Sequence, residues 1–179
     1  MQTEIIFSGF GGQGALFAGQ LMAYTALDLD KHVTWFPSYG PEMRGGTAHC
    51  TVIISDDEIG SPMITRPDVA VVMNLPSLEK YEPLVKPGGV LVVNTSLVNR
   101  EAKRKDIDVV KVPANEIAEE MGETRLANMI LLGALLKQVP ILPAKQVADS
   151  LGRHIPKHRR SLLEANLKAM KRGASLVSG

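Results

Sequence analysis

A glycine-rich loop near the start of the chain constrains the fold more than any other feature. It follows an apolar, β-forming run at residues 4–8 and opens a helix-like run at residues 13–28. The loop reads G-F-G-G-Q-G, and its first, third and sixth residues fit the spacing G-x-G-x-x-G. Such glycines permit a tight turn and let a ligand approach the N-terminus of a helix. The candidate phosphate-binding or partner-facing residues are Gly9, Gly11, Gly12, Gln13 and Gly14.

The second half of a dinucleotide-binding signature is missing. Chains that bind dinucleotides carry an Asp or Glu at the end of the second strand, where its carboxylate binds the ribose. Here the predicted second strand, 32–36, runs into Pro37 and Ser38, while Asp28 and Asp30 precede it. The loop could hold a phosphate, another backbone segment or no ligand. The missing acid favours a role other than dinucleotide binding.

Strand-like and helix-like runs alternate along the chain, which predicts one Rossmann-like α/β domain over residues 1–179 with a mostly parallel sheet. Continuous apolar runs at 68–74 and 90–94 are typical of central strands. An antiparallel hairpin could form between strand 47–55 and residues 59–64. The remaining expected elements are a strand at 107–112, a short helix at 78–85, and a helical C-terminal third with helices near 114–121, 124–138, 143–152 and 155–172.

Composition excludes several classes of function. The chain has 179 residues, 45% of them hydrophobic, which is enough for the core of one domain. A net charge of +1 and an aromatic content of 4% give no drive toward nucleic acids or membranes. No apolar run approaches the roughly 20 residues needed to span a bilayer, and no signal peptide is expected. We therefore expect a cytoplasmic protein with no nucleic-acid partner and no membrane partner.

The single cysteine, Cys50, limits the cofactors that this chain could hold. An iron–sulfur cluster needs about four thiolates, so no cluster can be held by this chain alone. The four histidines show no metal-ligand spacing with nearby carboxylates. We expect no metal and no cofactor bound by this chain alone, and we expect Cys50 to be a small buried hydrophobic residue.

A second loop rich in glycine follows the predicted second strand. Residues 38–48 read S-Y-G-P-E-M-R-G-G-T-A, at the sheet edge where ligands bind in open α/β folds. An arginine there could bind a carboxylate or a phosphate, or could simply pair with the nearby glutamate in a surface turn. We expect an interface or a substrate-side role, with the candidate residues Ser38, Tyr39, Glu42, Arg44, Gly45, Gly46 and Thr47.

Polar residues end two of the predicted central strands. Asn74 ends the strand at 68–74 and is a further candidate on the interface or substrate side, because it could bind a ligand at the same edge. Residues 94–96 end the next strand in the same way. Asn and Ser at such positions more often cap a helix, and capping is the preferred interpretation for both.

The C-terminal helix is strongly basic. Residues 153–172 carry seven Lys or Arg against Glu164 alone. A solvated helix face explains this pattern, and docking onto an acidic partner or onto coenzyme phosphates is the alternative.

Three stretches, in order, resemble the gamma subunit of the 2-oxoacid:ferredoxin oxidoreductases, the family that acts on pyruvate, 2-oxoglutarate or 2-oxoisovalerate. They are residues 9–14, residues 38–47 and the run Arg66-Pro67-Asp68. Residues 74–77 and 86–89 also look like that family, and the resemblance covers essentially the whole chain. Together the two glycine loops are quite specific.

The resemblance implies a multi-subunit enzyme that oxidatively decarboxylates a 2-oxoacid with coenzyme A, giving an acyl-CoA and carbon dioxide. Electrons would pass through iron–sulfur clusters to ferredoxin or flavodoxin. Thiamine diphosphate, Mg²⁺ and the clusters would belong to partner alpha, beta and cluster-bearing subunits. This chain would complete and brace the complex without a catalytic residue of its own. 2-Oxoglutarate and 2-oxoisovalerate are favoured over pyruvate.

Two alternatives stand beside this interpretation. One is a stand-alone nucleotide- or phosphate-binding module with a Rossmann-like fold. The other is an oxidoreductase that binds its own NAD.

Overall fold

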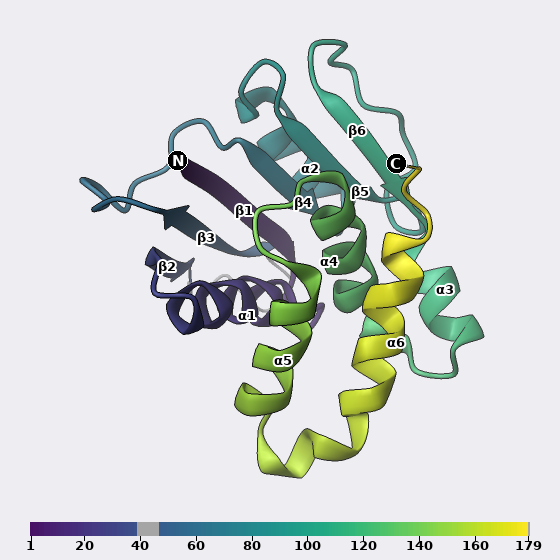
Figure 1. Cartoon of the computed structure of the whole chain (residues 1–179). Helices are drawn as coiled ribbons and strands as arrows, with labels where there is room; N and C mark the ends of the chain where they lie inside the picture. Colours follow the sequence, from purple (N-terminus) through teal and green to yellow (C-terminus); the bar gives the residue numbers. More distant parts are fainter. Residues whose placement is uncertain (39–46, 179) are drawn as a thin grey trace.

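A mixed six-stranded sheet with helices on both faces forms the centre of the protein (Figure 1). The computed structural model describes residues 1–38 and 47–178. The strand order is β2-β3-β1-β4-β5-β6. The strands are β1 (Gln2–Phe10), β2 (His32–Ser38), β3 (Thr47–Ser55), β4 (Val69–Val72), β5 (Val90–Asn94) and β6 (Asp108–Val112). The helices are α1 (Ala15–Asp28), α2 (Leu75–Tyr81), α3 (Ala114–Glu120), α4 (Ala127–Gln138), α5 (Ala144–His154) and α6 (Leu163–Ala174), with 3₁₀ turns η2 (Glu82–Leu84), η3 (Thr124–Leu126) and η4 (Lys157–Leu162).

The antiparallel strand of the sheet is β3, which lies between β1 and β2 and pairs with both of them. The predicted hairpin partner at 59–64 is therefore wrong: within the described residues, the segment 56–68 contains no strand. The reason is that β3 already has a neighbour on each side. Its pairing runs from Gln2↔Ser55 to Phe10↔Thr47 along β1, and from His32↔Ser55 to Ser38↔His49 along β2.

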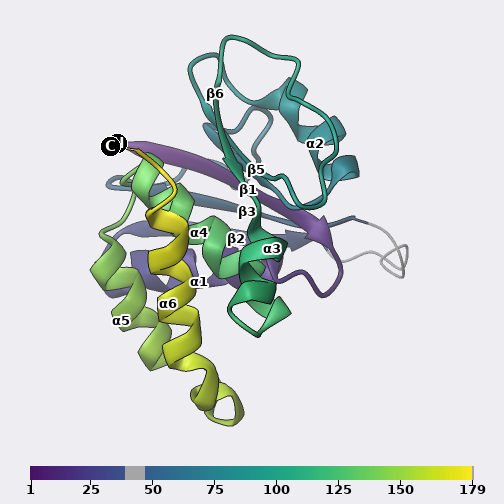
Figure 2. The same ribbon diagram turned by 90° about the vertical axis from the view of Figure 1, so that its right-hand side faces the viewer.

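Two hydrophobic cores lie on opposite faces of the sheet, beneath the helices that Figure 2 shows on either side of it. Because successive strand residues point to opposite faces, Ile5 and Phe7 of β1 enter the larger core, while Ile6 enters the smaller one. Helices α1, α4, α5 and α6 cover the larger core, and α2 covers the smaller one. The expected α/β class and single sheet are confirmed.

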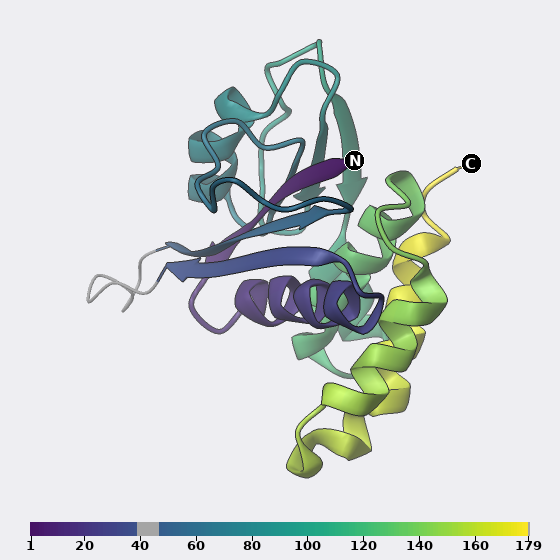
Figure 3. The ribbon, with the colours of Figure 1, turned by 60° about the vertical axis from the view of Figure 1, so that its left-hand side comes forward.

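The C-terminal third is helical, as expected. In Figure 3, α5 and α6 extend away from the sheet beside the end of α1. Helix α4 is the most deeply buried of these elements, with every residue from Asn128 to Leu136 buried. Two expected helices, 124–138 and 155–172, instead begin with the 3₁₀ turns η3 and η4. No helix in the described part of the chain has the length and apolar character needed to cross a membrane.

Candidate functional site

The carboxyl ends of β1 and β4 define the most favourable ligand-binding edge of the sheet. These strands are parallel neighbours, but α1 follows β1 on one face while α2 follows β4 on the other. Ligands bind in open α/β sheets where the connections diverge in this way. The glycine loop leaves β1 at this point. The expectation that it opens the first helix at the sheet edge is confirmed.

The glycines of this loop have different structural roles. Gly12 and Gly14 have positive φ angles of 91° and 81°. A Cβ atom on Gly14 would collide with the side chain of Asn128, and one on Gly9 would lie 2.7 Å from Gln13 Oε1. A Cβ on Gly12 would meet nothing within 4 Å. Gly9 and Gly14 therefore allow close packing, whereas Gly12 borders open space.

The Gln13 side chain closes the loop over the end of the sheet. Its Oε1 accepts hydrogen bonds from the Phe10 backbone N–H (2.6 Å) and from Asn74 Nδ2 (3.3 Å). Asn74 Oδ1 also accepts from the Ser77 N–H (2.9 Å), at the N-cap of α2. The capping interpretation of Asn74 is confirmed. This side chain also ties the glycine loop to β4, which its position in the sequence did not indicate.

Asn94 and Ser96 cap a helix that lies about 20 residues further along the chain. Asn94 Oδ1 accepts from the Ala114 N–H (3.2 Å), and Ser96 Oγ accepts from the Asn115 and Glu116 N–H groups (3.2 Å each). These donors belong to the first turn of α3, which has no cap from its own N-cap side chain. The expected capping role is confirmed, but the capped helix follows the next strand, β6.

Two cavities meet at Gly12 and Arg125, beside the N-terminus of α1. One has a volume of about 230 Å³ and extends toward the end of β5, and the other, of about 170 Å³, extends toward η4. The N-cap of α1 is Gly14, which offers no side chain to the first-turn N–H groups. Such a terminus attracts anions because its N–H groups and its dipole are unopposed. Other lining residues are Gln13, Asn94, Asn115 and Thr124 for the first cavity, and Phe17, Glu123, Asn128, Arg159 and Asn166 for the second.

Polar groups for a ligand come from three residues that the sequence analysis did not select. Asn128 Nδ2 donates to the Gly14 carbonyl (3.2 Å), but its buried Oδ1 has no hydrogen-bond partner within the described residues. Arg125 pairs with Glu123 through two contacts of 2.9 and 2.8 Å, which lowers the pKa of Glu123 to about 2. Arg159 is exposed and forms no ion pair within the described residues. The site thus combines a helix N-terminus, two guanidinium groups and an unmet acceptor.

The second glycine loop starts and ends at the same edge of the sheet. Ser38 ends β2 opposite His49, and Thr47 begins β3 opposite Phe10, the last residue of β1. The two glycine loops therefore leave neighbouring strand ends. The other candidates of this loop, Tyr39, Glu42, Arg44, Gly45 and Gly46, lie outside the described residues.

Among the residues that the structure describes, the donor set does not fit an iron–sulfur cluster or a Mg²⁺ ion. Cys50 is fully buried, and burial raises the pKa of its thiol to about 12. Within the described residues, no three His, Cys, Asp or Glu side chains are grouped so that they could hold a metal. The expectation that Cys50 is a buried hydrophobic residue is confirmed.

Comparison with known proteins identifies the family of this chain. Residues 4–176 match the family model described as pyruvate ferredoxin/flavodoxin oxidoreductase. The chain belongs to this family.

Two curated relatives have been given more specific names. The chain is 36% identical to the 2-oxoglutarate synthase subunit KorC of Methanocaldococcus jannaschii, covering 97% of this chain and 92% of the relative. It is also 36% identical to the ketoisovalerate oxidoreductase subunit VorA of Methanothermobacter marburgensis, covering 97% of this chain but 36% of the relative. The chain thus spans about a third of the length of VorA and nearly all of KorC.

Two solved structures share the fold. The gamma subunit of a keto/oxoacid ferredoxin oxidoreductase from Geobacter sulfurreducens has a TM-score of 0.83 at 30% identity, with 97% of each chain covered. The 2-oxoglutarate:ferredoxin oxidoreductase of Magnetococcus marinus, solved with 2-oxoglutarate, coenzyme A and succinyl-CoA bound, has a TM-score of 0.87 at 25% identity, covering 98% of this chain and 31% of that one. The expected resemblance to a gamma subunit is confirmed.

Proposed function

We propose that this chain is the gamma subunit of a cytoplasmic, multi-subunit 2-oxoacid:ferredoxin oxidoreductase. The complex would convert a 2-oxoacid and coenzyme A to an acyl-CoA and carbon dioxide, and would pass the electrons to ferredoxin or flavodoxin. The observation that carries this proposal is the near-complete overlap with KorC, whereas the same sequence spans only a part of VorA. A unit that exists both alone and within a longer chain is expected to work in contact with the rest of that chain.

The active cofactors would belong to partner subunits. This chain contains one cysteine, with a pKa of about 12, which is unsuited to ligating iron. Thiamine diphosphate, Mg²⁺ and the clusters would therefore be held by the alpha, beta and cluster-bearing subunits. The names of the relatives favour 2-oxoglutarate or 2-oxoisovalerate as the substrate, ahead of pyruvate.

The contribution of this chain to the reaction would be an anion cradle for coenzyme A. The N-terminus of α1 borders both cavities at Gly12, Arg125 lines both while paired with Glu123, and Arg159 lines the second cavity. A phosphate of the coenzyme is the group that such a site favours. The unmet Asn128 Oδ1 could accept from an N–H or O–H group of the same ligand. For the second glycine loop, from Ser38 to Thr47, we propose an interface or substrate-side role.

Purification of the complex tests the proposal. A tagged chain isolated from its native host should retain a thiamine-diphosphate subunit and a cysteine-rich subunit. That assembly should reduce a viologen dye only with both a 2-oxoacid and coenzyme A, and the isolated chain should show no turnover. A panel of 2-oxoglutarate, 2-oxoisovalerate and pyruvate would identify the substrate. Sustained turnover by the isolated chain would refute the proposal.

A substitution at Arg125 tests whether the proposed anion cradle binds coenzyme A. In the complex, Arg125→Ala should raise the KM for coenzyme A about tenfold, the effect of losing one charged hydrogen bond. Arg160→Ala, in the adjacent η4 turn but outside both cavities, is the matched control. An unchanged KM for coenzyme A in Arg125→Ala would remove this residue from the cradle.

The alternative of an NAD-binding oxidoreductase has little geometric support. In the described sheet β3 separates β2 from β1, so the end of β2 is one strand further from the glycine loop than in a dinucleotide fold, and β2 contains no acid. Calorimetric titration of the isolated chain with NAD should give no dissociation constant below roughly 10 μM. Tighter binding would favour this alternative, and tight binding of another nucleotide would favour a stand-alone nucleotide-binding module.

A further inference from the structure

An apolar groove lies between α5 and α6, over the C-terminal end of α4. We call it the α5–α6 groove. Its volume is about 530 Å³, and its walls are formed mainly by Leu136, Ala148, Leu167 and Met170. Leu136 belongs to α4, Ala148 to the first half of α5, and Leu167 and Met170 to α6. Because Ala144 and Ala174 also line the groove, it lies at the end of the α5–α6 pair that is opposite η4. Figure 1 shows α5 and α6 side by side in front of α4.

The groove is held open by a close crossing of two helices. A Cβ atom on Gly133 of α4 would overlap the Met170 carbonyl of α6, and one on Gly173 would overlap the Ile130 carbonyl. The two backbones are thus in direct contact, which fixes α6 against the buried helix α4. The floor and one wall of the groove are therefore formed by two helices whose backbones lie in direct contact.

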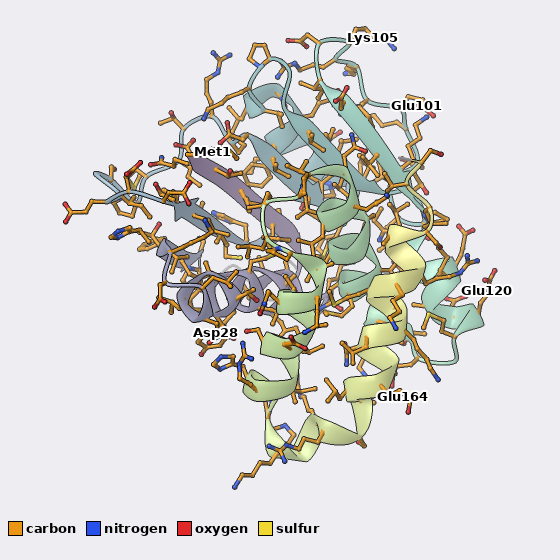
Figure 4. The ribbon with its side chains drawn as sticks, in the orientation of Figure 1. Met1, Asp28, Glu101, Lys105, Glu120 and Glu164 are labelled. Carbon is orange, nitrogen blue, oxygen red and sulfur yellow. The ribbon has the colours of Figure 1, made fainter. Side chains whose placement is uncertain are left out.

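Lysines surround the apolar walls. Lys137, Lys145 and Lys171 line the groove, one from each of its three helices. Lys145 pairs with Asp149 at 2.8 Å, but Lys137 and Lys171 are exposed and form no ion pair with any residue that the structure describes. On the outer side of α6, Lys168 pairs with Glu164 (2.7 Å), which is labelled in Figure 4. Among the described lysines of α4, α5 and α6, the two without an ion pair are therefore those beside the groove.

The charge of the whole chain is unevenly divided, although four of the basic residues, Arg153, Lys157, Arg159 and Arg160, lie at the η4 end rather than beside the groove. Residues 137–179 contain nine Lys or Arg and two acids, a net charge of +7. Residues 1–136 contain eleven Lys or Arg and seventeen acids, a net charge of −6. The overall value of +1 hides this separation. A basic region on an otherwise acidic chain favours and orients the approach of an acidic surface.

We propose that the α5–α6 groove is the docking site for an acidic segment of a partner subunit. The segment would insert one or two apolar side chains between Ala148 and Leu167 and would place Asp or Glu side chains against Lys137 and Lys171. This inference rests on the proposed function for the identity of the partner, a subunit of the same oxidoreductase. Nucleic acid would leave the apolar walls unfilled, and a lipid surface would need apolar side chains that protrude rather than a recess.

Two groove variants and a matched control test the docking site. The tagged chain is bound to beads, and retention of the thiamine-diphosphate subunit is measured at about 150 mM salt, where surface charges are partly screened. Lys137→Glu/Lys171→Glu should reduce retention about tenfold or more, because reversed charges would repel an acidic segment. Ala148→Trp, which fills the groove without changing its charge, should have a similar effect. Lys103→Glu/Lys105→Glu, in the exposed loop before β6, should retain the partner at the wild-type level.

The same experiment distinguishes a failure of the docking site from a failure of the proposed function. Thermal unfolding of each variant confirms that the fold is intact, and a variant that unfolds is replaced by Lys137→Gln/Lys171→Gln, for which reduced retention is again expected. If the wild-type chain retains the partner and the groove variants retain it equally well, the docking site is refuted while the proposed function stands. If the wild-type chain retains no partner subunit, both are refuted. A wild-type dimer that dissociates in the groove variants would assign the groove to a second copy and would also refute the proposal.

Discussion

The glycine loop at the start of α1 and the crossing of α4 over α6 both depend on glycine, but for opposite reasons. At Gly12 the backbone needs a positive φ, and the space beside it is open. At Gly133 the backbone is an ordinary helix, and the space is filled by the Met170 carbonyl. The open space beside Gly12 belongs to two cavities and leaves room for a ligand, whereas the filled space beside Gly133 indicates packing. The conformation and surroundings of a glycine, rather than its motif, thus indicate its role.

The largest effect is expected at the helix crossing. Gly133→Val would force α6 away from α4 and should lower the free energy of unfolding by about 3 kcal/mol or more, in the range of severe overpacking. Thermal or denaturant unfolding followed by circular dichroism measures this. A loss of stability smaller than about 1 kcal/mol would mean that the two backbones can separate easily. That result would contradict the packing role of Gly133.

A smaller effect is expected in the glycine loop. Gly12→Ala should cost about 1–2 kcal/mol through its left-handed backbone alone, because no atom opposes the new methyl group. Gly14→Ala should cost more, since the methyl group also meets Asn128. Unfolding midpoints of both variants test this order.

Gly12→Val should be measured in the assembled complex, where it separates a ligand-facing or partner-facing role of Gly12 from a packing role. If the open space receives a ligand or a partner, this variant should lose activity well beyond its change in melting temperature. Parallel losses of stability and activity would instead give Gly12 the same packing role as Gly14.

Helix α1 begins at the glycine loop, and its C-terminal end is held by α5, which packs beside the crossing of α4 and α6. Asp28 Oδ2 accepts from Arg153 Nη2 at 2.6 Å, and the Arg153 guanidinium lowers the pKa of Asp28 from 3.8 to about 2. His154 lies 3.4 Å from the same carboxylate and stacks on Tyr24 with ring centroids 4.3 Å apart. In Figure 4, Asp28 is labelled where α1 meets α5.

Arg153→Ala should lower stability by about 1 kcal/mol at pH 7, less than the full pKa shift would give because Arg153 is half exposed. The pKa of Asp28 is lower in the folded state than in the unfolded state, so the stabilisation is present above about pH 4 and is lost as the pH falls toward 2. The difference between wild type and variant should therefore disappear near pH 2, as unfolding at several pH values would show. A difference that does not depend on pH would assign the effect to packing.

The smallest expected effect has the opposite sign. Gly152 lies within α5, where a Cβ atom would meet only Leu163 Cδ2 at 4.0 Å. Gly152→Ala should raise the free energy of unfolding by about 0.5–1 kcal/mol, because the helix gains a better helix-forming residue without a collision. A destabilised Gly152→Ala would show that available space does not decide the effect of a glycine substitution in this protein.

Part of the candidate site could be predicted because it depends on neighbours in sequence. Residues 9–14 had to form a turn between strand and helix, and the apolar runs at 68–74 and 90–94 had to be central strands. Asn128 and Arg125 could not be selected, because their place beside Gly14 and Gly12 depends on how α4 packs more than 100 residues later in the chain. The nearest local signal was the run from Gly122 to Asn128 that opens a helix.

The sequence by itself determined most of the strands and helices, although not that residues 59–64 form no strand, and it determined the family that the two glycine loops indicate. Only the tertiary structure decided that β3 lies between β1 and β2, that Asn94 caps α3, and that Gly133 and Gly173 bring two helices into contact. The physical reason is that hydrophobic periodicity and turn residues act over a few neighbours. Strand order, by contrast, depends on which distant surfaces bury each other best, and a nine-residue alternating strand such as β3 is compatible with several partners.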